Sequence, residues 1–119
     1  MTEPSDYAEK MISAAEAETI LKEAYGFDGK AVKLPGETDL NFRISVDKVH
    51  KYILKISSPE ILSEDLDYQQ SLLQYIEKKN PSILAPRVIE DNSGNTVSHI
   101  LDRQGNKRLV RLLSWIPGR

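Results

Sequence analysis

The sequence predicts a single α+β domain, made of about five antiparallel strands, an N-terminal helix and a second helix packed on the sheet. Three observations favour this class. Runs with strand-like alternation follow one another with only short turns between them, which is typical of antiparallel pairing. One segment with helical spacing precedes the strands and another interrupts them. The chain has 119 residues, 39% of them hydrophobic, which suits one compact core.

Charge and composition exclude several classes of function. Sixteen basic and eighteen acidic residues give a net charge of −2, and neither sign forms a long block, so we expect no nucleic-acid partner. No apolar run approaches the roughly twenty residues that span a bilayer, and the start lacks a signal-peptide pattern. We therefore expect no membrane partner and a cytoplasmic location. Cysteine is absent and the two histidines, His50 and His99, are isolated, so no metal site is expected in this chain.

The first elements are a leader and a helix. Residues 1–12 are polar and acidic and are expected to form a flexible leader. The helix over residues 13–26 begins with a candidate capping box formed by Ser13 and Glu16, and Gly26 provides the stop. An apolar stripe on this helix needs a sheet to cover, and it consists of Ala17, Ile20, Leu21 and Ala24.

Three strands follow as an antiparallel meander. A short strand leads through a proline-glycine turn into a second strand, in which Phe42, Ile44 and Val46 alternate with polar residues. The segment "DKVH" then forms a turn into the third strand, "YILKIS". We expect the apolar stripe of the N-terminal helix to pack on this meander.

A second helix and further strands complete the predicted fold. Residues 63–79 have helical spacing, with an apolar stripe of Leu62, Leu66, Leu73 and Ile76, and the same steps of three and four residues place Gln69 on the inward face. Two or three more strands then surround the turns "NSGN" and "RQGN". We expect residues 31–115 to form one antiparallel sheet, with the second helix packed on one face.

Lys55 lies between Leu54 and Ile56 in the third strand, where burying a charge is costly. Strand alternation puts Lys55 with Ile53 on the face opposite Leu54 and Ile56, so one interpretation is an ordinary solvated lysine. The other interpretation is a phosphate-binding lysine. A lysine late in an apolar third strand, after a glycine-containing turn and before a helix, matches the kinase arrangement.

Five segments, in this order and at these separations, resemble the N-terminal lobe of the aminoglycoside phosphotransferase and choline kinase-like superfamily: "LPGETDLNFRIS", "YILKIS", "DLDYQQSLLQYI", "PRVI" and "RLVRLLSWIPG". The closest resemblance is to hydroxylysine kinase-like and homoserine kinase-like members, including the kinase-like domains fused ahead of class III aminotransferases. The resemblance implies that residues 13–119 form a protein kinase-like N-terminal lobe, whose sheet is the roof of an ATP cleft and whose end is the inter-lobe hinge.

The resemblance also implies roles for residues of the second and third strands. Lys55 matches the phosphate-binding lysine, and Ile53 matches the apolar residue that packs on adenine, although it is alternatively an ordinary core residue. The G-x-G-x-x-G loop of protein kinases is absent, and the turn holds only Gly36. Asn41 matches an asparagine whose amide can donate to a phosphate, and it is alternatively a common turn residue.

Further roles fall on the second helix and on the last strand. Gln69 matches the position where many members place a glutamate that holds the lysine, with Asp65 one turn earlier as a candidate to assist; Gln69 is alternatively a rim residue. The segment "LLSWIPGR" resembles the hinge, with Leu113 as gatekeeper and with the Ser114 carbonyl and Ile116 amide placed to pair with the edge of adenine. The alternative for this segment is a strand end before a proline-glycine turn.

Catalytic residues and Mg²⁺ ligands are expected outside this chain, because the superfamily places them after the hinge and no H-x-D-x-x-x-x-N motif occurs here. The resemblance implies the nucleotide-binding half of an ATP- or GTP-dependent kinase, inactive alone, that acts on the hydroxyl of a small amine or amino acid. The expected partners are the nucleotide and a substrate bound through the missing lobe, and self-association is expected of a lobe cut at its hinge. The alternative is a non-catalytic nucleotide-binding or regulatory module, with an aminotransferase fusion as one context.

Overall fold

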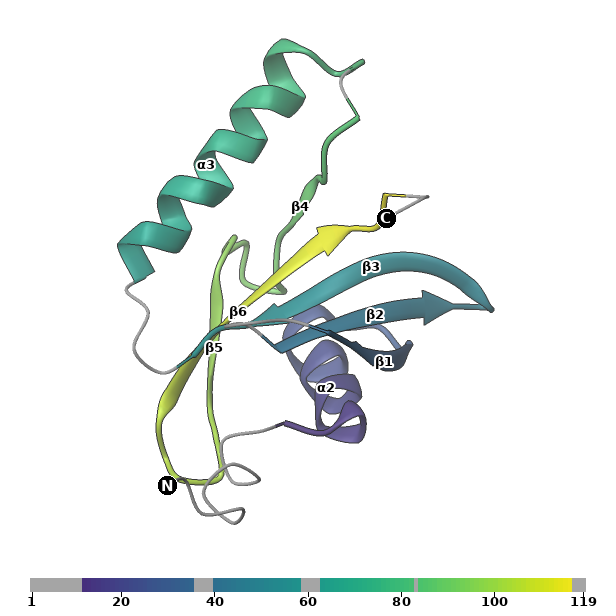
Figure 1. Ribbon diagram of the computed structural model, residues 1–119. Helices are drawn as coiled ribbons and strands as arrows, with labels where there is room; N and C mark the ends of the chain where they lie inside the picture. The colour runs from purple at the N-terminus through teal and green to yellow at the C-terminus, as the bar shows by residue number, and fades with distance from the viewer. Residues whose placement is uncertain (1–11, 36–39, 59–62, 83, 117–119) are drawn as a thin grey trace.

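The structure, a computed structural model, describes residues 12–35, 40–58, 63–82 and 84–116 (Figure 1). The elements in chain order are the helix α2 (Ala14–Ile20), the π-helical turn η1 (Leu21–Tyr25), the strands β1 (Lys30–Leu34), β2 (Leu40–Val46) and β3 (Val49–Ile56), the helix α3 (Ser63–Lys79), and the strands β4 (Val88–Ile89), β5 (Ser98–Leu101) and β6 (Lys107–Ser114). This mixture of helices and strands confirms the predicted α+β class.

The six strands of the described ranges belong to one antiparallel sheet, with the order β1-β2-β3-β6-β4 and with β5 paired to β6. The first three strands form the predicted meander. One edge of β6 has two partners, because β5 pairs with Lys107 to Val110 and β4 pairs with Leu112 and Leu113. The predicted sheet of about five antiparallel strands is therefore confirmed. A sixth strand is present because β6, with eight residues, is long enough to pair with both β4 and β5 along one edge.

Helix α2 covers one face of the sheet (Figure 1). The predicted capping box is present, since Ser13 N–H donates to Glu16 Oε1 at 3.0 Å and Glu16 N–H donates to Ser13 Oγ at 3.1 Å. The helical segment ends after η1 at Gly26, whose φ of 81° is the left-handed conformation that glycine adopts without strain. The core under α2 includes Ala17, Leu21, Phe42, Ile44, Leu54, Ile56, Val110 and Leu112.

The last residue of the expected leader is part of this core. Residues 1–11 lie outside the described residues. Ile12, the last residue of the expected leader, is only 3% exposed and belongs to the core cluster. The packed part of the chain therefore includes Ile12.

Helix α3 lies beside β4, on the other side of the sheet from α2 (Figure 1). Its bounds are the predicted ones. Leu66 and Gln70 are buried, and Gln70 Nε2 donates to the carbonyl oxygen of Thr96 at 2.9 Å. Leu73 and Ile76 are only half-buried, so α3 packs on the sheet near β4 and leaves the middle of this face open. No helix in the described ranges is long and apolar enough to cross a membrane.

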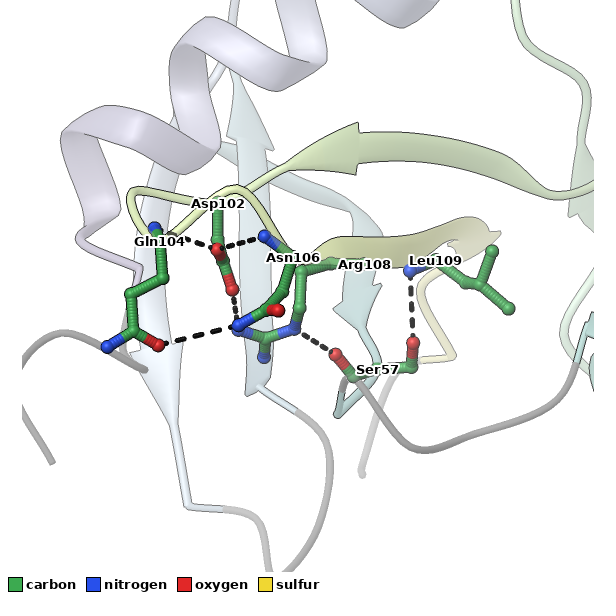
Figure 2. A network of polar contacts seen from close by, with 6 residues as sticks. All are labelled: Ser57, Asp102, Gln104, Asn106, Arg108 and Leu109. Atoms are coloured by element: carbon green, nitrogen blue, oxygen red, sulfur yellow. Dashed lines mark hydrogen bonds and ion pairs between the residues drawn. The ribbon is translucent and has the colours of Figure 1, made fainter. Parts of the chain in front are cut away.

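Two tight loops share the pattern Asp-x-x-Gly-Asn, at residues 91–95 and 102–106. In each loop, Oδ1 of the aspartate accepts hydrogen bonds of 2.9 Å from the backbone N–H groups two and four residues later. In the second loop, Asp102 also pairs with Arg108 at 3.4 Å, and both side chains are buried (Figure 2). Arg108 Nε donates to the Ser57 carbonyl at 2.6 Å, which ties the β5–β6 hairpin to the end of β3.

This network keeps the Asp102 carboxylate charged. Burial alone would raise the pKa of Asp102, but hydrogen bonds from the backbone of Asn106 and Gln104, together with the Arg108 guanidinium, outweigh burial and lower it. The negative charge therefore remains opposite the buried Arg108 over the ordinary range of pH.

Candidate functional site

A pocket of about 520 Å³ lies on the face of the sheet opposite α2. That volume is typical of small-molecule sites. The walls come from the end of β1, the middle of β2 and β3, the segment before β4 and the end of β6. The lining residues are Leu34, Pro35, Arg43, Ile53, Lys55, Pro86, Leu113, Ser114, Trp115 and Ile116.

Strand β3 presents alternate side chains to the pocket and to the core. Leu54 and Ile56 are fully buried in the core, whereas Ile53 and Lys55 are half-buried and line the pocket. This is the alternation that the sequence predicts for a strand with one covered face. Lys55 therefore lies in a concave site and not on an open strand surface.

Asn41 on β2 holds the Lys55 side chain. The two residues are direct cross-strand partners, and Lys55 Nζ donates a hydrogen bond to Asn41 Oδ1 at 3.0 Å. The family resemblance implies a contact between the Asn41 amide N–H and a phosphate. In the structure the side-chain carbonyl oxygen of Asn41 accepts a hydrogen bond from the lysine and so positions it. Gly36, in the turn before β2, lies outside the described residues.

The expectation that Gln69 lies on the inward face of α3 is wrong. Gln69 is exposed, whereas the next residue, Gln70, is fully buried. A step of four from Leu66 leads to Gln70, and this step turns the inward face away from Gln69. Gln69 Oε1 accepts a hydrogen bond from Arg111 Nη1 at 3.0 Å, and Arg111 is the cross-strand neighbour of Lys55. Gln69 thus borders the lysine through Arg111 and does not line the pocket.

The end of β6 forms the wall where the sequence predicts a hinge. Leu113 pairs with Ile53 across the strands, and Leu113 and Ile116 are 4% and 6% exposed. Ser114 N–H donates to the Arg87 carbonyl at 2.9 Å, but Arg87 N–H donates to Ser114 Oγ at 2.8 Å and not to the Ser114 carbonyl. The serine hydroxyl, and not the serine carbonyl, is therefore the acceptor for Arg87 N–H in this strand pairing. Pro117 lies outside the described residues.

Arg43 is a pocket residue that the sequence analysis missed. It pairs with Ile53 across the strands, and its buried Nε has no hydrogen-bond partner within the described ranges. The signal was present, because Phe42 and Ile44 face the core and a strand must turn the residue between them to the other face. Four further lining residues were also missed, although they belong to segments that carry the family resemblance: Leu34, Pro35, Pro86 and Trp115.

The chemistry of the site suits a ligand with a flat apolar part and an anionic part. Ile53 and Leu113 offer an apolar surface, and the cations of Lys55 and Arg43 lie on the same face of the sheet. Arg111 adds a third cation beside Lys55. In the part of the chain that the structure describes, no group of three or more histidine, aspartate or glutamate side chains could hold a metal ion.

Comparison with known proteins defines the fold. No protein-family model and no curated protein matches the sequence. The amicoumacin kinase hAmiN, solved in complex with AMP-PNP, Ca²⁺ and Ami, matches with a TM-score of 0.76 at 18% identity, over 98% of this chain and 35% of that one. A microcompartment-associated aminopropanol kinase matches with a TM-score of 0.73 at 14% identity, over 89% of this chain and 32% of that one.

The chain therefore spans about a third of the length of these two kinases. At this level of identity the likeness is one of fold. It confirms the predicted kinase-like lobe, with an antiparallel sheet and two helices.

Proposed function

We propose that this chain is the nucleotide-binding half of a small-molecule kinase, which uses ATP or GTP with Mg²⁺ to phosphorylate a hydroxyl group of an amine or an amino acid. One observation carries the proposal. Five residues that the sequence assigns to nucleotide binding line a single pocket of about 520 Å³: Ile53, Lys55, Leu113, Ser114 and Ile116. A fold alone does not define a function, so the argument rests on this pocket.

Lys55 is the residue that binds the phosphates in this proposal. Its ammonium is held by Asn41 at 3.0 Å, and Arg111 on the neighbouring strand adds positive charge. Lys55 follows Ile53 by two residues on β3, which is roughly 6.6 Å in an extended chain. A nucleotide can therefore contact the same strand with its base and with its phosphates.

The base packs on Ile53 and Leu113, which are cross-strand partners in the pocket. The edge of the base meets the backbone of β6. Because the N–H and C=O of one residue in a strand point to the same edge, the Ser114 carbonyl points away from β3, as its N–H does. Trp115 N–H donates to Lys51 on β3, so alternation returns Ile116 N–H to the side of the Ser114 carbonyl. One acceptor and one donor thus face the base edge.

Arg43 completes the base site. Arg43 lines the pocket beside Ile53, its cross-strand partner, and its Nε has no partner among the described residues. A planar guanidinium stacks well on an aromatic face, so Arg43 covers the purine in the bound state.

The catalytic aspartate, the Mg²⁺ ligands and the acceptor site belong to a part of the protein outside this chain. The coverage of the two structural neighbours supports this division, because this chain matches only 35% and 32% of their lengths; one of them is a complex with AMP-PNP and Ca²⁺, and the other is an aminopropanol kinase. Aminopropanol carries the amine and the hydroxyl that the proposal requires of a substrate. A hydroxylysine kinase-like or homoserine kinase-like specificity, and a cytoplasmic location, remain predictions.

The protein encoded by the complete gene tests the proposal. It is assayed with ATP and with GTP, in the presence of Mg²⁺, against a panel of amino alcohols and hydroxy amino acids. We expect a phosphorylated product with at least one member of the panel. Nucleotide binding without turnover would favour the non-catalytic module instead. A protein that binds neither nucleotide would overturn both.

A further inference from the structure

Helix α3 carries a stripe of exposed side chains on the face opposite its buried residues. The stripe consists of Glu64, Tyr68, Leu72, Tyr75 and Lys79, and we call it the α3 stripe. Spacings of three and four residues place all five on one side of the helix. The buried residues Leu66 and Gln70 lie on the other side.

The middle of the α3 stripe is apolar and aromatic. Tyr68, Leu72 and Tyr75 are 71%, 48% and 58% exposed. They account for three of the seven large hydrophobic side chains that are exposed within the described ranges. Scattered apolar residues on a surface are ordinary, but a contiguous apolar stripe is typical of an interaction site.

The ends of the stripe carry opposite charges. Glu64 and Asp65 lie in the first turn of α3, and Lys78 and Lys79 lie in the last turn. None of these four side chains forms an ion pair in the part of the chain that the structure describes. They are therefore available to a partner whose charges run in the opposite direction.

The stripe is complementary to itself when a second copy is turned end for end. Glu64 and Lys79 lie equally far from a point between residues 71 and 72, and Tyr68 and Tyr75 do so as well. A two-fold axis at this point places each glutamate opposite a lysine, each Tyr68 opposite a Tyr75, and Leu72 beside its own copy. A parallel pair would place like charges together.

We propose that the α3 stripe binds the α3 stripe of a second copy of this chain, in an antiparallel pair about a two-fold axis beside Leu72. Such an isologous contact is the commonest symmetry of soluble homo-oligomers. One helix face buries less surface than the roughly 1,200 Å² of a stable interface, so the dimer is weak and depends on protein concentration. The contact does not involve the pocket, and the inference is independent of the proposed function.

Single cysteines test the geometry, because the natural chain has none. Tyr68→Cys and Tyr75→Cys proteins with different tags are mixed and oxidised mildly. We expect the mixed disulfide to form at least several times faster than the disulfide of either variant with itself. Val49→Cys, which replaces an exposed residue at the start of β3, is the control and should give only slow collisional pairing. Equal rates for all pairs would overturn the proposal.

Charge reversal supplies a second, independent measurement. By sedimentation equilibrium, Glu64→Lys should weaken self-association about tenfold, because it turns two attractive pairs into two repulsive ones. Adding Lys79→Glu in the same chain restores opposite charges across the axis and should recover the wild-type dimerisation constant. Circular dichroism checks that each variant is folded. A double variant as weak as the single one, or a wild type that stays monomeric at millimolar concentration, would contradict the antiparallel pair.

Discussion

Lys55 and Asn41 face each other across β3 and β2, and the lysine Nζ donates a hydrogen bond of 3.0 Å to the asparagine Oδ1. The contact fixes the end of a flexible side chain within a pocket that is otherwise mostly apolar. A fixed ammonium loses less conformational entropy when an anion binds than a mobile one does. Asn41 is therefore a positioning residue for Lys55.

Replacing Asn41 by leucine should weaken nucleotide binding without unfolding the protein. The substitution removes a hydrogen bond that positions Lys55, and a charge-assisted bond of this kind contributes about 1.5 kcal/mol, which corresponds to roughly a tenfold loss of affinity. Isothermal titration with ATP and GTP measures the change. Asn80→Leu, at an exposed position after α3, is the control and should bind as the wild type does. An unchanged affinity in Asn41→Leu would remove the positioning role.

Arg43→Met should distinguish binding of the base from binding of the phosphates. Because the buried Nε has no partner among the described residues, the substitution should leave the free energy of unfolding unchanged or raise it by up to about 1 kcal/mol. Affinity for ATP or GTP should fall roughly tenfold through lost stacking, while affinity for inorganic tripolyphosphate stays the same. Titration of both ligands decides the matter. Equal losses for nucleotide and tripolyphosphate would show that Arg43 binds phosphate and not the base.

Asp102→Asn should destabilise the fold strongly. The substitution removes the negative charge that Asp102 places beside the buried Arg108, and breaking a buried pair in this way costs about 3 kcal/mol in comparable cases. Chemical unfolding at neutral pH measures the loss. The matched control is Asp28→Asn, because the Asp28–Lys22 pair is well exposed, with side chains 83% and 67% accessible, and should cost less than about 0.5 kcal/mol. Similar losses for the two variants would contradict the structural role given to Asp102.

The same residue predicts a dependence on pH. The folded state lowers the pKa of Asp102 below its ordinary value, so its contribution to stability is complete above that ordinary value of about 3.9 and is lost as pH falls through the lower, folded pKa. The difference in unfolding free energy between wild type and Asp102→Asn should therefore be constant from pH 5 to 7 and shrink below about pH 4. A difference that grows on acidification would contradict the sign.

Local patterns were enough to predict the strands of the meander and the faces of β3. Alternation separates Leu54 and Ile56 from Ile53 and Lys55, because the period of a strand is two and a shift of one residue would bury the charge. The helix α3 shows the limit of this reasoning. Its period of 3.6 allows either Gln69 or Gln70 to face inward after Leu66, and only the packing near Thr96 decides in favour of Gln70.

The rest of the pocket depends on contacts that are distant in sequence. Pro86 and Trp115 lie in segments that carry the family resemblance, but no local pattern shows that either residue lies in one pocket with Lys55, and only the order of the strands brings them together. The bond from Arg87 N–H to Ser114 Oγ joins residues 27 positions apart. Propensity and periodicity describe only neighbours along the chain, so neither could predict these contacts.

The account depends most directly on Lys55 as the ligand of nucleotide phosphates. Lys55→Met keeps the length and the apolar stem of the side chain and removes its charge together with its hydrogen bond to Asn41, at a position that is only half-buried, so the melting temperature should change little. The measurement is the dissociation constant for ATP and GTP, with Lys107→Met, an exposed lysine at the start of β6 outside the pocket, as the control. The account predicts that Lys55→Met loses roughly ten- to a hundredfold in affinity, because a charge-assisted contact contributes about 1.5 to 3 kcal/mol, while Lys107→Met loses nothing. Wild-type affinity in a folded Lys55→Met protein would contradict the central claim.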